Sequence, residues 1–115
     1  MEILKIKITK KELAEKHLNY FETVSKAVVD IAKEIMAVDA ELHSDLEALL
    51  LEDGSEQEFL WGINLYPFKE KKDFIEFTAL INIRPSQKNR SMEIEDSSIR
   101  EKIVKIVDKL VDYGN

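Results

Sequence analysis

The stretch FLWGINLY, residues 59–66, decides the fold, because apolar side chains occupy every second position. In an extended strand, successive side chains point to opposite faces of the sheet. One face of this strand would carry four apolar side chains, those of Phe59, Trp61, Ile63 and Leu65. The other face would carry Gly62, Asn64 and Tyr66. The pattern predicts a strand with Trp61 in the core and a more polar opposite face, where Gly62 leaves a dent.

A second strand is predicted directly downstream, over residues 74–84, FIEFTALINIR. The apolar face of this strand would carry Ile75, Phe77, Ala79, Ile81 and Ile83. Pro67 and the charged residues 69–73, KEKKD, supply a short connection, which favours an antiparallel pair. Pro85 would end the second strand, because proline cannot donate a backbone hydrogen bond to a sheet.

The N-terminal half predicts a strand, a helix and two further strands. Residues 3–8, ILKIKI, alternate apolar and charged side chains, as a strand does. A helix is predicted over residues 9–24, because it opens with capping-box spacing and continues with apolar residues at helical spacing. Residues 27–31 and 35–48 show a period of two and predict two strands joined by a turn at 32–34.

Residues 44–54 permit two interpretations. Ser44 and Glu47 have capping-box spacing and could open a short helix that ends at Gly54. Asp53 and Gly54 also form a dipeptide that is typical of two-residue hairpin turns. We favour the hairpin slightly.

The closing helix has the strongest pattern. Ser98 and Glu101 have capping-box spacing, Asp96 lies just ahead, and Gly114 follows as a stop. One apolar stripe runs along it, formed by Ile99, Ile103, Ile106, Val107 and Leu110. Together the elements predict a single α+β domain over residues 1–115. It would have an antiparallel sheet of about five or six strands, with two amphipathic helices packed on one face.

Composition limits the classes of function. The chain has 115 residues, a formal net charge of −6 and no cysteine, which excludes disulfides and thiolate chemistry. The acidic balance argues against nucleic-acid binding, which needs clustered cations. We expect no membrane association, because no apolar run reaches the ~20 residues of a membrane span. The N-terminus lacks the pattern of a secretory signal, so we expect a cytoplasmic protein.

The stretch NIRPSQKNRS, residues 82–91, predicts a ligand site. It carries three cations and no acid in an otherwise acidic chain. Two arginines among neutral donors suit an anion such as a carboxylate or phosphate. The candidate ligand-binding residues, in this loop and on the polar strand face beside it, are Arg84, Arg90, Ser86, Gln87, Asn89, Asn82, Asn64 and Tyr66. The alternative is an exposed loop whose arginines pair with the acids that follow.

A metal site is a second candidate. Glu41, His43 and Asp45 would share one face of a strand, and carboxylates with an imidazole can ligate Zn²⁺ or Mn²⁺. The same residues would support a metal-assisted hydrolase. A solvated strand face explains this alternation equally well. The other histidine, His17, lies on the apolar stripe of the predicted first helix, and we expect it to pack there.

Several segments resemble a family of short prokaryotic proteins of unknown function. They are ELHSD, LLLEDGSEQ, LWGINLYP and INIRPSQKNRS, together with the closing helix. The resemblance covers nearly the whole chain from about Lys26. It implies a complete stand-alone domain and no catalytic residues.

The sequence leaves three hypotheses for function. The preferred one is a small binding or regulatory module that holds a polar or anionic small molecule and uses no cofactor. The alternatives are the metal-assisted hydrolase and a structural homodimer, which would bury the open face of the sheet.

Overall fold

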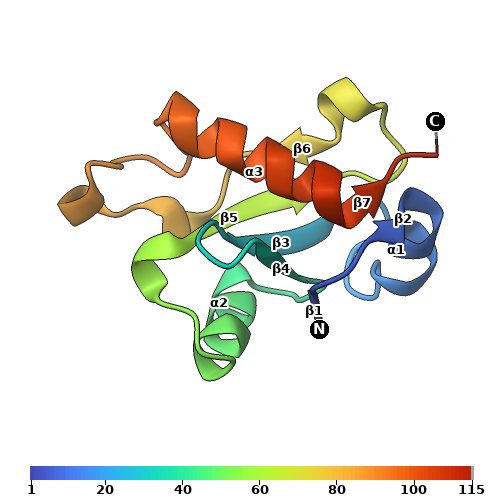
Figure 1. The fold of residues 1–115 in the computed structure, drawn as a ribbon, viewed down its shortest axis with the longest axis horizontal. Coiled ribbons are helices and arrows are strands. Elements are labelled where there is room, and N and C mark those ends of the chain that lie inside the picture. Colours follow the sequence, from blue (N-terminus) through green and yellow to red (C-terminus); the bar gives the residue numbers. More distant parts are fainter. Residues whose placement is uncertain (115) are drawn as a thin grey trace.

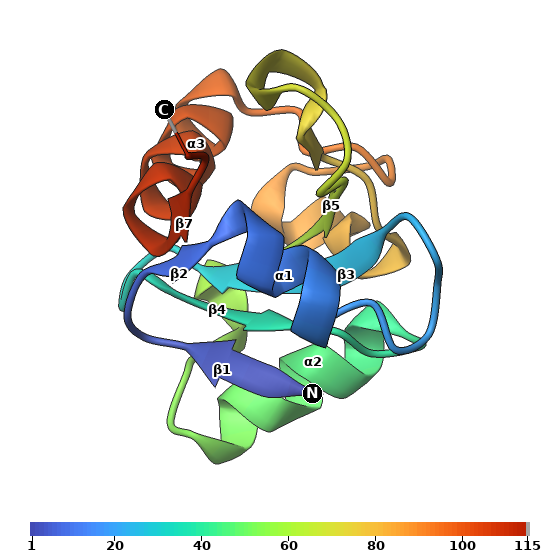
Figure 2. The same ribbon diagram turned by 90° about the vertical axis from the view of Figure 1, so that its right-hand side faces the viewer.

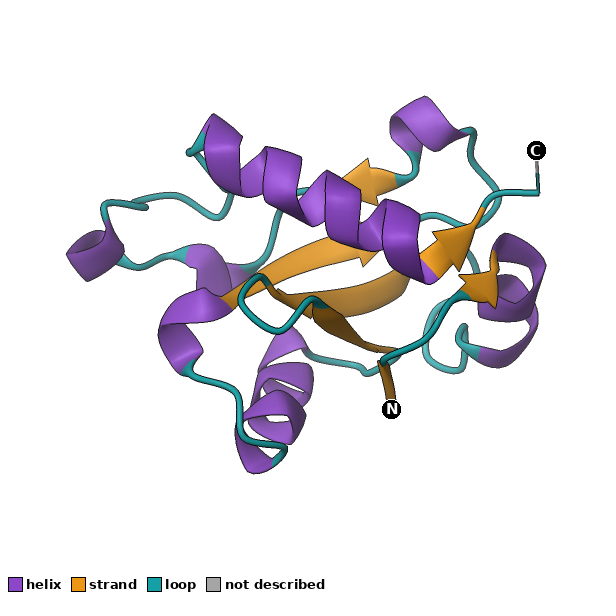
Figure 3. Cartoon of the chain, in the orientation of Figure 1, coloured by secondary structure: helices purple, strands orange, loops and turns teal. Residues whose placement is uncertain are grey.

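A five-stranded antiparallel sheet runs through the middle of the molecule, with helices on both of its faces (Figures 1 and 3). The computed structural model describes residues 1–114. In chain order, the helices and strands are β1 (Glu2–Leu4), β2 (Ile8–Thr9), α1 (Lys10–Lys16), β3 (Ser25–Asp30), β4 (Ile35–Val38), α2 (His43–Glu52), β5 (Leu60–Leu65), β6 (Ile75–Glu76), α3 (Ser97–Leu110) and β7 (Val111–Asp112). The spatial order of the sheet is β1-β4-β3-β5-β6, and a parallel pair, β2-β7, lies beside it. The predicted α+β class and the five antiparallel strands are confirmed.

The strand β5 turns the predicted face toward the larger core cluster. Trp61, Ile63 and Leu65 are buried in the larger core cluster, beneath α3. β5 pairs with β3, and the register sets Ile63 opposite Ala27. The predicted pair of strands around the turn at 32–34 is also confirmed, since β3 and β4 pair antiparallel.

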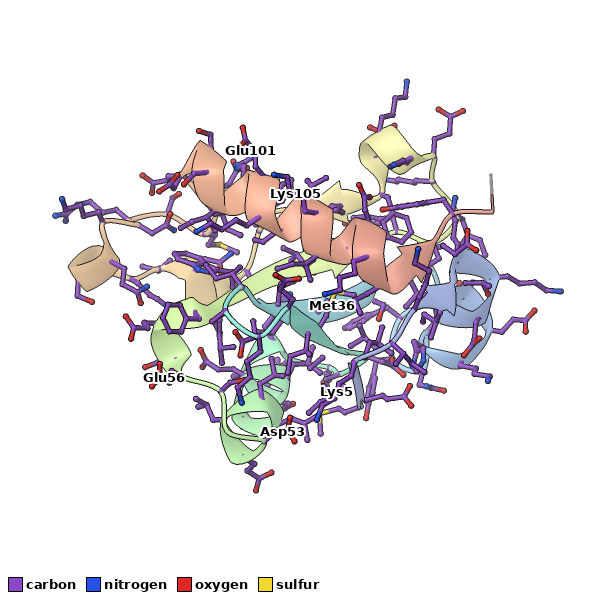
Figure 4. The ribbon with its side chains drawn as sticks, viewed as in Figure 1. Lys5, Met36, Asp53, Glu56, Glu101 and Lys105 are labelled. Carbon is purple, nitrogen blue, oxygen red and sulfur yellow. The ribbon has the colours of Figure 1, made fainter. Side chains whose placement is uncertain are left out.

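Two helices, α1 and α3, pack on the same face of the sheet, as predicted (Figure 2). The stripe of α3 is buried at Ile103, Ile106, Val107 and Leu110, and Met36 of β4 lies beneath it (Figure 4). The side chain of Asp96 caps α3 by accepting a hydrogen bond from the Ser98 amide, 2.8 Å away. Within residues 1–114, no helix is long and apolar enough to cross a membrane.

The N-terminal elements are shorter than predicted. The strand predicted over 3–8 is divided into β1 and β2, because only the first part pairs with β4. The helix predicted over 9–24 begins correctly, with the Thr9 hydroxyl accepting from the Glu12 amide, but ends at Lys16. The following loop is fixed by Asn19, which donates from its backbone and its side chain to the Asp39 carboxylate.

The slightly favoured hairpin at residues 44–54 is wrong, because this segment forms the helix α2. The strand predicted over 35–48 ends at Val38, and Asp39 turns the chain with a positive φ of 71°. α2 then packs its buried Leu46 and Leu50 against the second face of the sheet. An ion pair between Lys5 and Asp53, 3.0 Å apart, links the end of α2 to the segment after β1 (Figure 4). The face that we predicted to be open is therefore largely covered.

The strand predicted over 74–84 is also wrong beyond its first residues. Only β6 pairs with β5, and residues Leu80–Asn82 form a short 3-10 turn. The turn does not keep the two-residue period of a strand, so over residues 82–84 the side chain that was predicted to be buried is exposed, and those predicted to be exposed are buried. Ile83 is 44% exposed, whereas Asn82 is fully buried and Arg84 is 8% exposed.

Asn82 takes the place of a strand at this edge of β5. Its side-chain Oδ1 accepts from the Gly62 amide at 2.8 Å, and its Nδ2 donates to the Gly62 carbonyl at 2.9 Å. The same Nδ2 donates to the Met92 carbonyl at 3.0 Å. Gly62 has no room for a side chain, since a Cβ there would lie 2.5 Å from the Cβ of Ala79. The predicted dent at Gly62 is therefore filled from within the chain.

We expect Gly62→Ala to destabilise the fold by about 2–3 kcal/mol, because the new methyl group overpacks a closed contact. The double variant Gly62→Ala/Ala79→Gly removes the closest clash and should recover roughly half of this loss. Urea unfolding of the two single variants and the double variant measures the coupling. Strictly additive losses would contradict the close approach of these two residues.

Candidate functional site

The guanidinium of Arg84 is buried between α2 and β5. Its Nη2 donates to Glu47 Oε2 at 3.0 Å, and its Nη1 donates to the Gln57 carbonyl at 3.0 Å. The guanidinium carbon lies 5.1 Å from the centre of the Trp61 ring. Burial lowers the pKa of Arg84, and the charge and hydrogen bond of Glu47 oppose this shift. The expectation that Arg84 points to an open face is therefore wrong, because its donors are used inside the protein.

Asn89 holds the loop that follows. Its buried side chain donates from Nδ2 to the carbonyls of Asn82, Ser91 and Glu93, at 2.7, 3.0 and 2.9 Å. Its Oδ1 accepts from the Glu95 amide at 2.9 Å. A buried asparagine with this many partners satisfies backbone groups that would otherwise lack hydrogen bonds.

The remaining predicted loop residues, Ser86, Gln87 and Arg90, are exposed. The amides of Arg90 and Ser91 donate to Glu95 Oε2 at 2.8 and 3.0 Å. These hydrogen bonds, with that of the Ser91 hydroxyl, lower the pKa of the Glu95 carboxyl. The loop thus has its own acceptor for two of its backbone donors.

Asn64 of β5 and Tyr66, the residue that follows the strand, lie together, as predicted. Both donate to Glu76 Oε1, from Asn64 Nδ2 at 2.7 Å and from the Tyr66 hydroxyl at 2.9 Å. Among residues 1–114, no hydrogen bond or ion pair links Asn64 or Tyr66 to Arg84 or Arg90. The structure therefore divides the eight predicted ligand-binding residues into separate groups.

The residues predicted for a metal site do not share a strand. Glu41 lies exposed before α2, Asp45 lies exposed in its first turn, and His43 is its first residue. His43 is nearly buried, at 9% exposure, and its Nε2 lies 2.8 Å from the Ile63 carbonyl. No group of three metal-ligating side chains that could hold an ion occurs in the described part of the chain. The other histidine, His17, is buried as expected, with its Nε2 3.0 Å from Glu2 Oε2.

A pocket of about 450 Å³ lies where α2 begins on the sheet, and we call it the His43 pocket. It is lined by Lys26, Leu42, His43, Ser44, Asn64, Thr78, Ala79, Leu80, Ile81 and Met92. α2 covers the apolar part of this sheet face at Val28 and Leu60. The pocket occupies the part of the same face that carries the polar side chains. Arg84 does not line it, so His43 and Arg84 do not face a common cavity.

His43 is neutral in this pocket near pH 7. A carbonyl oxygen only accepts, so Nε2 carries the proton that is donated to Ile63, and Nδ1 is the unprotonated nitrogen. Burial lowers the pKa of His43 below its ordinary value of 6.5, the hydrogen bond to Ile63 opposes the shift, and the charge of Lys26 lowers it further. Since His43 is neutral, the charge among the residues that line this pocket is that of Lys26.

Lys26 occupies an uncommon position for a cation. It lies on β3, the central strand of the sheet, directly opposite Asn64 of β5. Its side chain is half-buried, and its ammonium lies 5.2 Å from the centre of the Phe21 ring. Within residues 1–114, no carboxylate lies within ion-pair distance of it. Lys26 was not predicted as a site residue, because the strand was expected to begin at Ala27, whereas β3 begins at Ser25. Extending the alternation one step back through SKAVVD would have found it.

The fold and pocket define a small α+β domain in which one face of the sheet carries the nearly buried His43 beside the half-buried Lys26. The model of the family DUF5674, described as a protein of unknown function, matches residues 2–110. The chain belongs to this family, and the resemblance to a family of unknown function is confirmed. No curated protein is significantly similar to the chain. No solved structure is significantly similar to it either.

Removing the Arg84 guanidinium should lower the free energy of unfolding. We expect Arg84→Ala to lose about 2–3 kcal/mol, because Glu47, whose side chain is only 14% exposed, would be left without its partner. Arg90→Ala is the matched control, and it should change stability by less than about 0.5 kcal/mol, since that side chain is exposed. Chemical denaturation measures both. Equal small effects would contradict the internal role of Arg84.

The stability of the protein should depend on pH through His43. The proton that makes His43 cationic binds more weakly to the folded form than to the unfolded form, because burial lowers the pKa of the imidazole. Stability is therefore full above the ordinary pKa of 6.5 and is lost as the pH falls below it. The loss should level off once the pH passes the lower folded pKa. His43→Gln keeps a side-chain donor but cannot titrate, so its unfolding free energy should lack this part of the pH dependence. Identical pH profiles for the two proteins would contradict the buried neutral imidazole.

Proposed function

We propose that the protein is a binding module for a small anionic molecule held in the His43 pocket. The observation that carries the proposal is Lys26, a half-buried cation on the central strand with no carboxylate at ion-pair distance in residues 1–114. An anionic ligand was also predicted from the sequence, and Asn64 is the one predicted ligand-binding residue that lines this pocket. It moves the site away from Arg84.

Lys26 presents its charge at the pocket without a carboxylate from residues 1–114 beside it. Its side chain is half-buried, and such lysines bury the stem while the ammonium stays within reach of solvent and of a ligand. Its neighbours on this face are apolar at Val28 and neutral at Asn64 and His43, and its ammonium lies 5.2 Å from the centre of the Phe21 ring. An anion in the pocket would supply the missing negative charge.

The start of α2 adds to the attraction for an anion. The residue at the N-cap is Leu42, so no side chain caps the first turn, and the Asp45 amide donates to the Leu42 carbonyl at 3.1 Å. The first amides of a helix and the helix dipole favour negative charge at this end of a helix. Ser44 lines the pocket and can donate from its hydroxyl. These groups support Lys26 and would not make a site without it.

The size and surroundings of the pocket also support a small molecule. Pockets of about 300–1,000 Å³ that are mainly apolar, with a few polar groups, are the usual form of ligand sites. The His43 pocket, at about 450 Å³, falls within this range. A titratable group with a shifted pKa is a further mark of functional sites.

An NMR titration of the ¹⁵N-labelled protein with sodium acetate and sodium phosphate tests the proposal. Saturable shifts should concentrate on the amides of Lys26, Asn64 and residues 43–45. Lys26→Met keeps the length of the side chain and removes its charge, so it should weaken the response at least about tenfold. Lys105→Met is the control, because Lys105 is exposed on α3 (Figure 4). Uniform shifts at all lysines, or an unchanged response in Lys26→Met, would contradict the proposal.

A further inference from the structure

We infer that the anion of the His43 pocket is a carboxylate with an apolar chain; the inference rests on the proposed function. Two observations lead to it. The side chains of Lys26, His43 and Asn64 lie at the sheet side of the pocket, and its outer rim is built mainly from exposed apolar side chains. A ligand with a charged head and an apolar tail would match both parts.

The rim is formed by three large apolar residues from three separate segments. Leu42 is 53% exposed, Leu80 is 70% exposed and Met92 is 40% exposed, and all three line the pocket. Single exposed apolar side chains are ordinary, but a group of them around a concave site marks a place where apolar surface is buried on binding. By contrast, Lys26 and Asn64 are half-buried beside the nearly buried His43.

The rim is held in place by the buried asparagine. Leu80 begins the 3-10 turn whose last residue is Asn82. Asn82 fixes this turn to Gly62 of β5 and also binds the carbonyl of Met92, so it orders two of the three rim segments. Exposed Leu80 and Met92 are therefore presented by a rigid framework.

The charge of the pocket favours a monoanion. Lys26 contributes one positive charge, and His43 is neutral at pH 7. No arginine lines the pocket, whereas sites for phosphate groups commonly use arginine or several cations. One ammonium with neutral donors suits a carboxylate.

Dissociation constants for acetate, butanoate, hexanoate and octanoate, read from the shifts of the Lys26 and Asn64 amides, test the inference. We expect affinity to rise about two- to fourfold per added methylene until the tail passes the rim. Octylammonium has the same chain with the opposite charge and should bind at least about tenfold more weakly than octanoate. Leu80→Ser should flatten the dependence on chain length while leaving acetate unchanged. Phe68→Ser, at another exposed apolar residue, is the control and should leave the series unchanged.

The possible failures can be told apart. Equal affinities of acetate and octanoate at these amides would overturn the apolar tail and leave the proposed function standing. Octylammonium binding as tightly as octanoate would overturn the carboxylate head and, with it, the anionic ligand of the proposed function. Absence of a saturable response at Lys26 and Asn64 for every acid would overturn both the inference and the proposed function.

Discussion

The pairing of the Asn82 carboxamide with the backbone of Gly62 is the contact on which this half of the molecule depends. One side chain supplies both a donor and an acceptor to a strand residue, as a neighbouring strand would. Because the Asn82 side chain makes these bonds, the backbone of residues 80–82 does not pair with β5 and can form the 3-10 turn. That turn places Leu80 at the rim of the His43 pocket and Ala79 against Gly62. The same residue therefore closes the sheet and shapes the pocket.

The polar stretch 82–91 is explained by this arrangement. A strand in a sheet satisfies its backbone groups with its neighbours, but an irregular segment must find other partners. Asn82 and Asn89 supply these partners for the buried carbonyls, and Glu95 supplies them for the amides of the loop. Arg84 joins the loop to α2 through Glu47. Arg84 and the two asparagine side chains of the stretch hold the protein together. The cation in the His43 pocket comes from elsewhere in the chain, at Lys26.

The parts of the fold that could be predicted from the sequence are those where one local pattern had no competitor. The alternation in β5 and the stripe of α3 each allow a single way to bury their apolar side chains, and both predictions are confirmed. α2 could not be separated from a hairpin, because Asp53-Gly54 serves a helix end and a turn equally well. The reversal at Asn82 depends on Gly62, a residue 20 positions away in the chain, and no local period carries that information. The local alternation reaches back to Lys26 and could have placed it on a strand, but only the sheet order shows that this strand is the central one.

The short β6 has a consequence for the behaviour of the protein in concentrated solution. A strand at the border of a sheet exposes a row of backbone donors and acceptors, and another chain can pair with such a row and begin aggregation. β6 pairs with only the last two residues of β5, Asn64 and Leu65, so much of the length of β5 needs another cover. A carboxamide can cover it without offering a new row of backbone groups on its outer side, as an added strand would. At Gly62 the border of β5 is thus closed by a side chain, which gives a second molecule no backbone groups to pair with at that point.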